Sequence, residues 1–392
     1  MKIVFGIFAM LLALGFSGCA PLPKKPTTPL PFNTAVRVLA DDLFYQVRQN
    51  NIASTLSNTV FISDPVIDAD SGDVTKTSEL IQGLIEAEAK QKFPTFLFAD
   101  MSSQKIRTAS YILTGIMRFE YFTNNATKLN RLVMSITDTT TGLIVAHSDV
   151  WISDANLAFE PTPIYRNSPM FLKDKQADSL IATASANVGN RASKAYMDSL
   201  AVSALLNEAS HAYEQGNLPV ALSLFQKASE DANGQQAMKT YSGLYQIYFR
   251  TGQIAEAENA FSKLLQLAIG SGSIANFKFL FRVNDTDFAG DPIKLKEYKI
   301  WLRQIAKQIA GSGTCMDIVG HASHTGTEDY NKRLSLKRAE RIQDRLQSEV
   351  KGVGKKTHAI GRGFSENKVG TGTDDERDAL DRRVEFKLAA CS

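Results

Sequence analysis

The chain has 392 residues, of which 44% are hydrophobic and 22% are charged, and its formal net charge at pH 7 is +3. This composition is typical of globular protein, and the length exceeds what one hydrophobic core can organise, so we expect roughly two to four domains. The small net charge gives no indication of nucleic-acid binding, and no apolar run beyond the N-terminus is long enough to span a membrane.

The N-terminus has the pattern of a secretory signal. Lys2 is followed by a segment without charged residues that ends at Gly18, and its apolar part is too short for a comfortable membrane span. Ser17 and Gly18 immediately precede Cys19, and this arrangement resembles the lipobox of bacterial lipoproteins. The resemblance implies removal of residues 1–18 and acylation of Cys19, while Ala20 in the next position implies an outer-membrane anchor facing the periplasm. An ordinary cleaved signal peptide is the alternative.

The first folded region is predicted to be an α+β domain. Residues 19–32 form a spacer ahead of it, because five prolines from position 21 onward disfavour both helix and sheet. Residues 33–160 then alternate helical and strand patterns and end in an antiparallel meander. The expected helices are Thr34–Asn50 and one capped by Thr77 or Ser78 that ends near Lys92, and the expected strands are Val60–Ile62, Phe96–Phe98, Ser110–Phe122, Leu132–Asp138 and Leu143–Ile152.

Two phrases in this region carry a family resemblance. Ala109–Gly115 and Thr137–Ala146 resemble the periplasmic domains of a group of envelope lipoproteins that includes CsgG, FlgO and LpoB. The resemblance covers these phrases and the order of the elements. It implies a role in assembly or in protein interaction, with no catalytic residues.

The central region is predicted to be helical. Residues 161–200 contain three prolines and then a helical stretch from about Gln176, so we interpret them as a linker that leads into helices. Residues 201–268 carry an internal repeat with a period of 36 residues. Its matching positions are Ala209, Ala212, Gly216, Leu218, Ala221, Phe225 and Ala228 in the first copy, and Tyr245, Tyr248, Gly252, Ile254, Ala257, Phe261 and Leu264 in the second.

This repeat resembles the tetratricopeptide repeat, whose usual period is slightly shorter. The glycines would allow the turn between two helices, and the small alanines would let the helices approach closely. The resemblance implies a concave surface that binds an envelope protein of unknown identity. A chance pair of amphipathic hairpins is the alternative.

The C-terminal region, residues 274–392, follows the glycine- and serine-rich segment 270–273 and is predicted to have the order βαβαββ. Its first strand is the alternating segment Phe277–Phe281, and its second strand, Asp317–Val319, runs into a Gly320–Gly326 loop. A helix lies on either side of this second strand, the later one beginning near Asp329. Two further strands are expected at His358–Gly363 and Arg383–Leu388.

The motifs of this region carry the most specific resemblance in the chain. They are Gly-His-Ala-Ser-His-Thr-Gly at 320–326, Tyr330-Asn331, Leu334-Ser335, Arg338-Ala339, Gly361-Arg362-Gly363 and Asp381-Arg382-Arg383-Val384-Glu385-Phe386. In this order and spacing they resemble the OmpA-like peptidoglycan-binding domain that is also found in the lipoprotein Pal. The family binds the diaminopimelate residue of the peptidoglycan stem peptide, whose end carries both a carboxylate and an ammonium group.

The resemblance implies a role for each matching residue. Arg338 would grip the carboxylate by a bidentate pair, Asn331 and Leu334 would line the pocket, and one of the pair Arg382 and Arg383 would support the site. Ser323 departs from the family, in which this position is an aspartate. Serine can accept a hydrogen bond from an ammonium but brings no charge, so we expect binding that is about ten- to thirtyfold weaker or adapted to a modified stem peptide. An OmpA-like fold that has lost this ligand and binds protein is the alternative.

The cysteines and histidines of the chain bear on whether it has a disulfide or a metal site. Beyond Cys19 the chain has Cys315 and Cys391, and an even pair in an exported protein favours a disulfide. If the strands that carry them are antiparallel neighbours, the two thiols come level. His321 and His324 lack an evident third ligand, so we expect no metal site, and no cofactor motif or hydrolase triad is present.

These observations favour a non-enzymatic outer-membrane lipoprotein that binds peptidoglycan and presents interaction domains between its two anchors. The alternative is an assembly factor of a secretion, pilus or flagellar system, in which wall binding only positions the protein. The N-terminal domain and its partners would discriminate the two.

Overall fold

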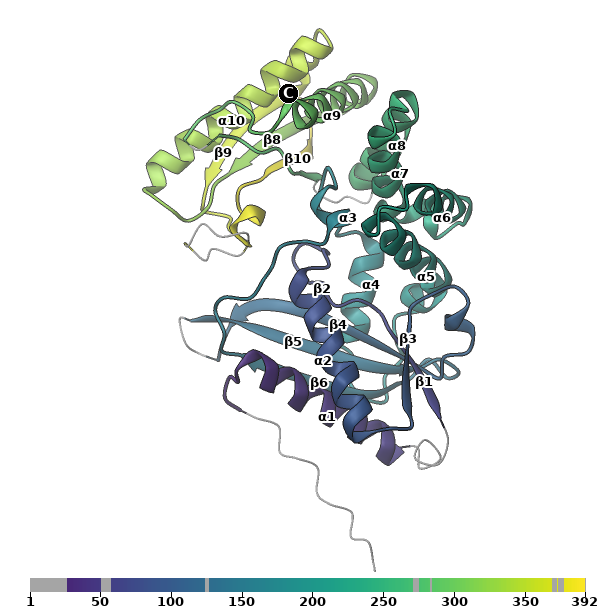
Figure 1. Cartoon of the computed structure of the whole chain (residues 1–392). Coiled ribbons are helices and arrows are strands. Elements are labelled where there is room, and N and C mark those ends of the chain that lie inside the picture. The colour runs from purple at the N-terminus through teal and green to yellow at the C-terminus, as the bar shows by residue number, and fades with distance from the viewer. Residues whose placement is uncertain are drawn as a thin grey trace, which may run out of the picture.

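The computed structural model describes residues 27–50, 58–123, 127–270, 275–282, 284–368, 372 and 377–391. The signal segment, Cys19, residues 271–273 and the acidic residues 374–376 lie outside the described residues. Over the described part of the chain the fold is mixed α+β, as predicted, with a sheet domain at each end and helices between them (Figure 1). No helix in these ranges is both long enough and apolar enough to cross a membrane.

The N-terminal sheet has the strand order β3-β1-β4-β5-β6, with β2 paired to β4. Its strands are β1 (Thr59–Ser63), β2 (Ile67–Asp68), β3 (Phe96–Asp100), β4 (Tyr111–Tyr121), β5 (Lys128–Asp138) and β6 (Ile144–Ile152). The first part is parallel, whereas β4, β5 and β6 are antiparallel and form the predicted meander. Leu30, in the expected spacer, forms a bridge with Ile152, so the chain is already attached to this sheet there.

Both faces of this sheet are covered by helices. The helices α1 (Phe32–Asn50) and α2 (Lys76–Lys92) pack on one face, where Leu113 of β4 joins their core. Ile112 points to the other face. The cap of α2 is Thr75, in a capping box with Ser78, rather than Thr77 or Ser78 itself, because the Thr75 side chain accepts the Ser78 backbone N–H.

The second face is covered by the segment that the sequence suggested to be a linker. After the short helix α3 (Pro163–Arg166), helix α4 (Lys175–Ala184) contacts β4 and β5 and contributes Leu180 and Ala184 to the core. These two residues are four positions apart and therefore lie on one face of the helix. Part of the range 161–200 is thus a layer of the N-terminal domain.

Two helical hairpins follow: α5 (Lys194–Glu214) with α6 (Leu218–Glu230), and α7 (Met238–Arg250) with α8 (Ile254–Gly270). Their turns are built alike. Gly216 and Gly252 have φ of 75° and 78°, and the backbone N–H of the next residue donates in each case to the carbonyl five positions before it. This left-handed conformation is why glycine recurs at the turn.

The C-terminal sheet has the order β7-β10-β8-β9, and its long helices lie between and beside the strands in the predicted βαβαββ sequence. The elements are β7 (Ala275–Phe277), α9 (Pro292–Gly311), β8 (Cys315–His321), α10 (Glu328–Glu349), β9 (Thr357–Gly363) and β10 (Val384–Ala389). Strand β7 is shorter than predicted. Beyond it, Phe281 forms a bridge with Phe288, which closes a hairpin-like loop, instead of extending the sheet.

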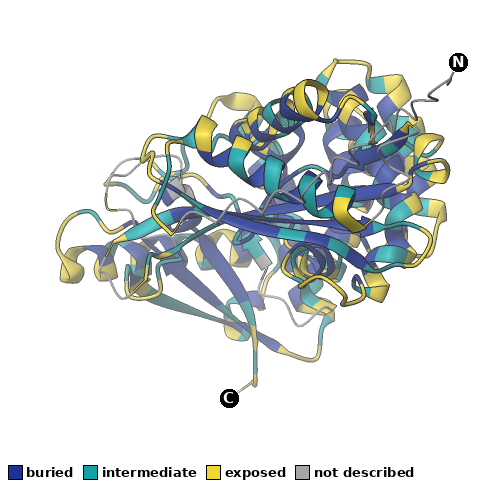
Figure 2. Cartoon of the chain, turned by 90° about the horizontal axis from the view of Figure 1, so that it is seen from below, coloured by how far each residue is buried: buried dark blue, intermediate teal, exposed yellow. Residues whose placement is uncertain are grey.

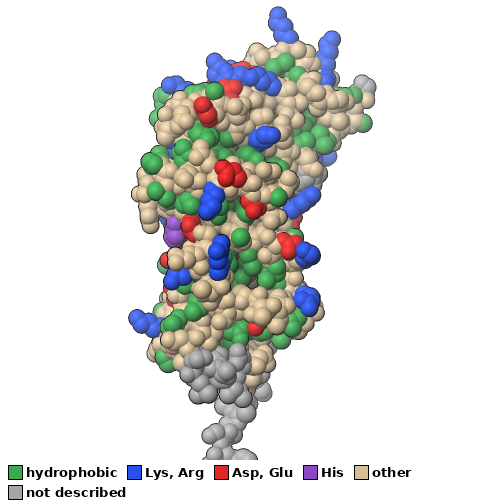
Figure 3. Space-filling view, turned by 90° about the vertical axis from the view of Figure 1, so that its right-hand side faces the viewer, with side chains coloured by type: hydrophobic (Ala, Val, Ile, Leu, Met, Phe, Trp, Pro, Cys, Tyr) green, Lys and Arg blue, Asp and Glu red, His purple; other side chains and the backbone are tan. Residues whose placement is uncertain are grey.

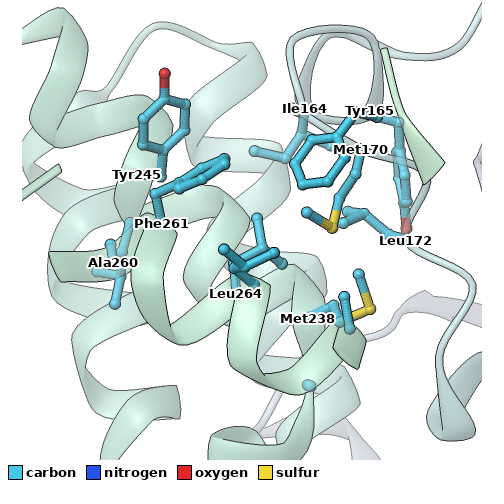
Figure 4. Close-up of a cluster of buried hydrophobic side chains, with 14 of the residues drawn as sticks. Ile164, Tyr165, Met170, Leu172, Met238, Tyr245, Ala260, Phe261 and Leu264 are labelled. Carbon is cyan, nitrogen blue, oxygen red and sulfur yellow. The ribbon is translucent and has the colours of Figure 1, made fainter. Parts of the chain in front are cut away.

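The parts of the chain share buried contacts. Trp301 of α9 stacks on Phe261 of α8 and donates its indole N–H to the Tyr245 hydroxyl at 2.7 Å. Figure 4 shows Tyr245 and Phe261 beside Ile164 and Met170 from the segment after the first sheet. Seen from below, the strands are dark blue and the outer helix surfaces are yellow (Figure 2). The second helical hairpin is therefore packed against α9 of the C-terminal region as well as against the segment after the first sheet.

Candidate functional site

A cavity of about 450 Å³ opens beside the C-terminal end of β8. Its walls come from the β8–α10 loop, the first turns of α10, the loop after β7 and the segment that leads into β10. All six residues that the sequence suggested as a ligand site line it: Ser323, Asn331, Leu334, Arg338, Arg382 and Arg383. Residues up to 60 positions apart in the chain therefore meet in one cavity.

Asn331 stabilises the conformation of the β8–α10 loop by hydrogen bonds. Its Nδ2 donates to the carbonyl of Thr325 at 2.6 Å and to that of Thr327 at 3.2 Å, while the Thr327 side chain caps α10 by accepting the backbone N–H of Tyr330. Gly326 between them has φ of +87°, which favours glycine. Asn331 thus shapes the rim of the cavity, and its amide nitrogen is already used inside the protein.

Arg338 lies at the floor of the cavity. Its guanidinium sits 5.1 Å from the centroid of the Phe281 ring, Nε donates to the carbonyl of Asp285 at 3.1 Å, and Nη2 donates to that of Arg282 at 3.2 Å. Burial is the main cause that lowers the pKa of Arg338 from its usual value. These contacts use one edge of the planar group, so the edge formed by its two terminal nitrogens can take a carboxylate.

Ser323 and Leu334 complete the wall near the loop. Ser323 is buried, and its Oγ lies 3.3 Å from Oγ1 of Thr325, so two hydroxyl groups stand together at this point. Leu334 is half-buried on α10, one turn before Arg338, and supplies an apolar surface. The position that carries an aspartate in the resembling family is therefore occupied here by a neutral pair of hydroxyl groups.

The two neighbouring arginines differ in their surroundings. Arg383 is buried and bonds to Glu385 at 2.7 Å and to the carbonyls of Leu380 and Glu366, so it supports the wall rather than the ligand. Arg382 is half-buried and lines the cavity.

His321, at the end of β8, also lines the cavity, with Nε2 3.4 Å from Oε2 of Glu385. Burial is the main cause that lowers the pKa of His321, which favours the neutral ring. Burial raises the pKa of Glu385, but His321 and the charges of Arg383 and Lys387 outweigh it, and the net shift is downward. His321, Glu366 and Glu385 lie close enough to suggest a cation site. Because Arg383 and Lys387 already pair with Glu385, we interpret the group as an ion-pair network.

Comparison with known proteins identifies the family to which the C-terminal region belongs. Residues 288–380 match the OmpA family. The C-terminal region is an OmpA-like domain. The match covers α9, β8, α10 and β9, and of these β8 and α10, with the loop between them, line the cavity.

Two curated relatives match the OmpA-like domain. Outer membrane porin F of Pseudomonas aeruginosa is 33% identical over 110 residues, which are 27% of this chain and 31% of the porin. Peptidoglycan-associated lipoprotein of the same organism is 35% identical over 82 residues, which are 21% of this chain and 48% of the lipoprotein. The chain thus spans less than half the length of each of these relatives.

Among solved structures, the peptidoglycan-associated lipoprotein of Burkholderia pseudomallei matches part of the chain. It is 23% identical, with a TM-score of 0.25, and the match covers 28% of this chain and 88% of that one.

The structure also shows site residues that the sequence analysis missed. Phe281 and the carbonyls of Arg282 and Asp285 form the seat of Arg338 in the OmpA-like domain. The alternating pattern up to Phe281 predicted a strand there, so the loop after β7 was not expected. The two phenylalanines at 281 and 288, which flank a mostly polar segment, were the available sequence signal for a closed turn.

The predicted disulfide is present in the OmpA-like domain. Cys315 and Cys391 are bonded, with their Cα atoms 5.0 Å apart. The reason is the antiparallel pairing of β8 with β10, which places Ala389 opposite Cys315 and brings the end of the chain back to the start of β8.

Proposed function

We propose that this protein is a lipoprotein of the outer membrane that binds peptidoglycan non-covalently through its OmpA-like domain and so links membrane to cell wall. An OmpA-like domain is a non-catalytic peptidoglycan-binding module of the cell envelope. One relative of this chain carries peptidoglycan association in its name. Acylated Cys19 would be the membrane end of the link, and the helical hairpins and N-terminal domain would be presented between the two ends.

The observation that carries the proposal is the environment of Arg338. A buried guanidinium that lies over Phe281, donates hydrogen bonds to two backbone carbonyls and lines a cavity is pre-organised for a carboxylate. Over the described residues no acidic side chain forms an ion pair with Arg338. The carboxylate of diaminopimelate would supply that partner, and a bidentate contact of this kind contributes about 1.5–3 kcal/mol.

Retention on isolated peptidoglycan sacculi tests this function. The wild-type chain should sediment with sacculi, and Arg338→Ala should reduce the retained fraction at least tenfold. Arg345→Ala is the matched control, since Arg345 lies on the same helix but is exposed and does not line the cavity. Equal retention of the wild type and Arg338→Ala would refute the pocket assignment.

The second candidate function is that of an assembly or accessory factor of a secretion, pilus or flagellar system. It is supported by a polar groove of about 600 Å³ between the N-terminal sheet domain and the first helical hairpin, with Asp100 and Lys105 on one side and Glu208 and His211 on the other. Figure 3 views the side of the molecule with the helices, where acidic and basic side chains are interspersed across the middle. Crosslinking in cells followed by mass spectrometry would test this function. Crosslinks from Lys105 to components of such a machine would favour it.

A further inference from the structure

The two edges of the N-terminal sheet differ in how their backbone groups are bonded. At the β6 edge, the N–H and the C=O of His147 both bond to the side-chain amide of Gln46. The backbone of Leu30 bonds to this edge near one end of the strand, and the backbone of Gly189 and Asn190 bonds to it near the other. Other parts of the chain therefore close the β6 edge.

The β3 edge carries backbone groups without such partners. The N–H of Thr59 in β1 donates to the C=O of Thr95, directly before β3. In a parallel ladder every second residue bonds to the same neighbour, so the backbone groups of Phe98 and Asp100 face away from β1. Among the described residues, no group bonds to these outward N–H and C=O groups. A strand edge of this kind can accept a further strand.

The open part of this edge borders the polar groove of about 600 Å³ beside the first helical hairpin. Residues 98–102 form the sheet side of the groove, and α5 and α6 form the facing side; β3 and α5 are neighbours in Figure 1. On the facing side, Val220 is 45% exposed and Leu224 is half-buried, so the groove also offers apolar surface. A segment bonded to β3 would therefore have a second wall for every other side chain.

The groove has an excess of negative charge. Glu86, Asp100 and Glu208 line it, and none of these three carboxylates forms an ion pair with a described residue. The hydrogen bonds that Glu86 and Glu208 accept come from a neutral amide and from a serine, so both carboxylates keep their charge. Lys105 and His211 are the basic side chains among the described lining residues.

The negative charge continues beyond the groove. An adjoining pocket shares Asp100 with it and adds Glu79 and Glu214. Burial and then the nearby charge of Glu214 raise the pKa of Glu79, because the two carboxylates lie close enough to repel each other. Lys239, which also lines this pocket, donates to the side chain of Asn207 at 3.3 Å. A ligand that brings positive charge is therefore favoured along this surface.

A second copy of this chain is a poor occupant of the β3 edge. Pairing of two β3 edges would bring two of these acidic grooves together, and like charges that oppose each other across paired strands destabilise the pairing. A basic segment of another protein would meet opposite charge instead.

We propose that β3 binds an extended segment of a partner protein by strand addition, and that this segment carries lysine or arginine among apolar residues. The outward backbone groups of Phe98 and Asp100 supply the hydrogen bonds, and the carboxylates of the groove select the basic side chains. The proposal rests on the second candidate function for the existence of a protein partner, and it is independent of the pocket around Arg338.

Three fluorescent peptides test the proposal with the full chain by fluorescence anisotropy. The first alternates valine and lysine, the second has glutamate in place of lysine, and the third is the first with its backbone amides N-methylated. The first should bind at least about tenfold more tightly than the second, whose charge the groove repels. It should exceed the third by a similar factor, because N-methylation removes the hydrogen bonds to β3 and leaves the charge unchanged. Equal binding of any two, or no binding of the first, overturns the proposal.

Asp100→Pro and Asp100→Ala form a matched pair of variants. Both remove the carboxylate, but only proline also removes the outward N–H and places its ring at the strand edge. Asp100→Ala should weaken binding of the valine–lysine peptide about threefold, and Asp100→Pro should weaken it at least about tenfold further. Equal affinity of the two variants overturns strand addition. If Asp100→Pro does not fold, the N-methylated peptide still decides, because it needs no variant.

Two further measurements separate this proposal from its alternatives. In sedimentation velocity, a wild-type dimer that Asp100→Pro loses would make a second copy the occupant and overturn the proposal. Arg338→Ala should bind the valine–lysine peptide like the wild type, and Asp100→Pro should stay on sacculi, so either function can fail without the other. Crosslinks from Lys105 to a secretion, pilus or flagellar component without any peptide binding would keep the second candidate function and overturn this mode of binding.

Discussion

Nζ of Lys278 lies 3.3 Å from Oδ2 of Asp73, and this buried ion pair joins the two sheet domains across 205 positions of sequence. Asp73 is in the turn before α2, and Lys278 directly follows β7. Lys278 also donates to the carbonyl of Tyr165 at 2.8 Å, and its ammonium lies 4.5 Å from the centroid of the Phe171 ring. A single lysine thus fastens the OmpA-like domain to three points of the N-terminal part.

The Asp73–Lys278 pair predicts a pH dependence of stability. Burial raises the pKa of Asp73 from 3.8 to about 6, so the folded state binds this proton more tightly than the unfolded state does. The resulting contribution is complete below pH 3.8 and is lost as the pH rises to about 6. Its size is about 3 kcal/mol, from roughly two pKa units.

Thermal unfolding of the wild type and Asp73→Asn between pH 4 and pH 7 would measure this contribution. The asparagine cannot titrate, so the difference in unfolding free energy between the two proteins should change by about 2.4 kcal/mol over this range. Other buried carboxylates, such as Asp64 and Asp174, titrate in both proteins and cancel in the comparison. Parallel pH curves for the two proteins would contradict the assignment.

The sequence predicted those features that depend on local pattern. The turns at Gly216 and Gly252, the meander of β4, β5 and β6, and the βαβαββ order follow from residue spacing within one or two neighbouring elements. The six residues suggested from the motif also lie in one cavity, because the motif fixes where each lies on α10 or near a strand end, and their role as ligand contacts stays a prediction.

Features that depend on distant contacts were not predictable in this way. The seat of Arg338 exists because Phe281 pairs with Phe288 instead of continuing β7, and nothing in the alternation of residues 277–281 distinguishes these outcomes. The helical stretch of α4 was predicted, but its packing on the sheet was not, because its apolar positions are explained only by the second face of the sheet, which α4 covers. The Asp73–Lys278 pair likewise has no local sequence signal.

The disulfide predicts a large loss of stability on reduction. Cys315 and Cys391 close a loop with a sequence separation of 76, and removing such a link raises the entropy of the unfolded chain by an amount worth about 4 kcal/mol. The double variant Cys315→Ser/Cys391→Ser should therefore unfold at a lower urea concentration than the oxidised wild type. Reductant should lower the wild type to the same midpoint and leave the variant unchanged. A wild-type midpoint that does not respond to reductant would rule out this contribution.

Replacing either turn glycine of the helical hairpins, Gly216 or Gly252, by alanine should lower the stability of the protein by a similar amount. A Cβ at Gly216 or Gly252 would meet no atom within 4 Å, so the cost of alanine there comes only from the positive φ and should be about 1–2 kcal/mol at each position. Gly83→Ala is the control, because Gly83 lies inside α2, also has open space and lacks a positive φ. It should stabilise the protein by about 0.5–1 kcal/mol. Urea unfolding of the three variants checks both signs, and a loss at Gly83 equal to that at Gly216 would contradict the reasoning.

Gly320 predicts a link between packing and ligand binding. A Cβ at this position would lie 2.2 Å from the carbonyl oxygen of Ser335, which belongs to the backbone of α10. Gly320→Ala therefore has to push α10 away from β8, and the overpacking should cost about 1–3 kcal/mol. Because Asn331, Leu334 and Arg338 lie on the displaced helix, retention on sacculi should fall together with stability.

Gly313→Ala provides the comparison for that experiment. Gly313 is in the loop before β8, a Cβ there meets no atom within 4 Å, and its φ lies outside the left-handed region. Urea midpoints and sacculus retention of this variant should match the wild type. If Gly320→Ala lowers the urea midpoint but retains full binding to sacculi, α10 can shift without disturbing the pocket. That result would contradict the prediction that binding depends on the position of α10. A joint loss would instead show that the close approach of α10 to β8 is what places the guanidinium over Phe281.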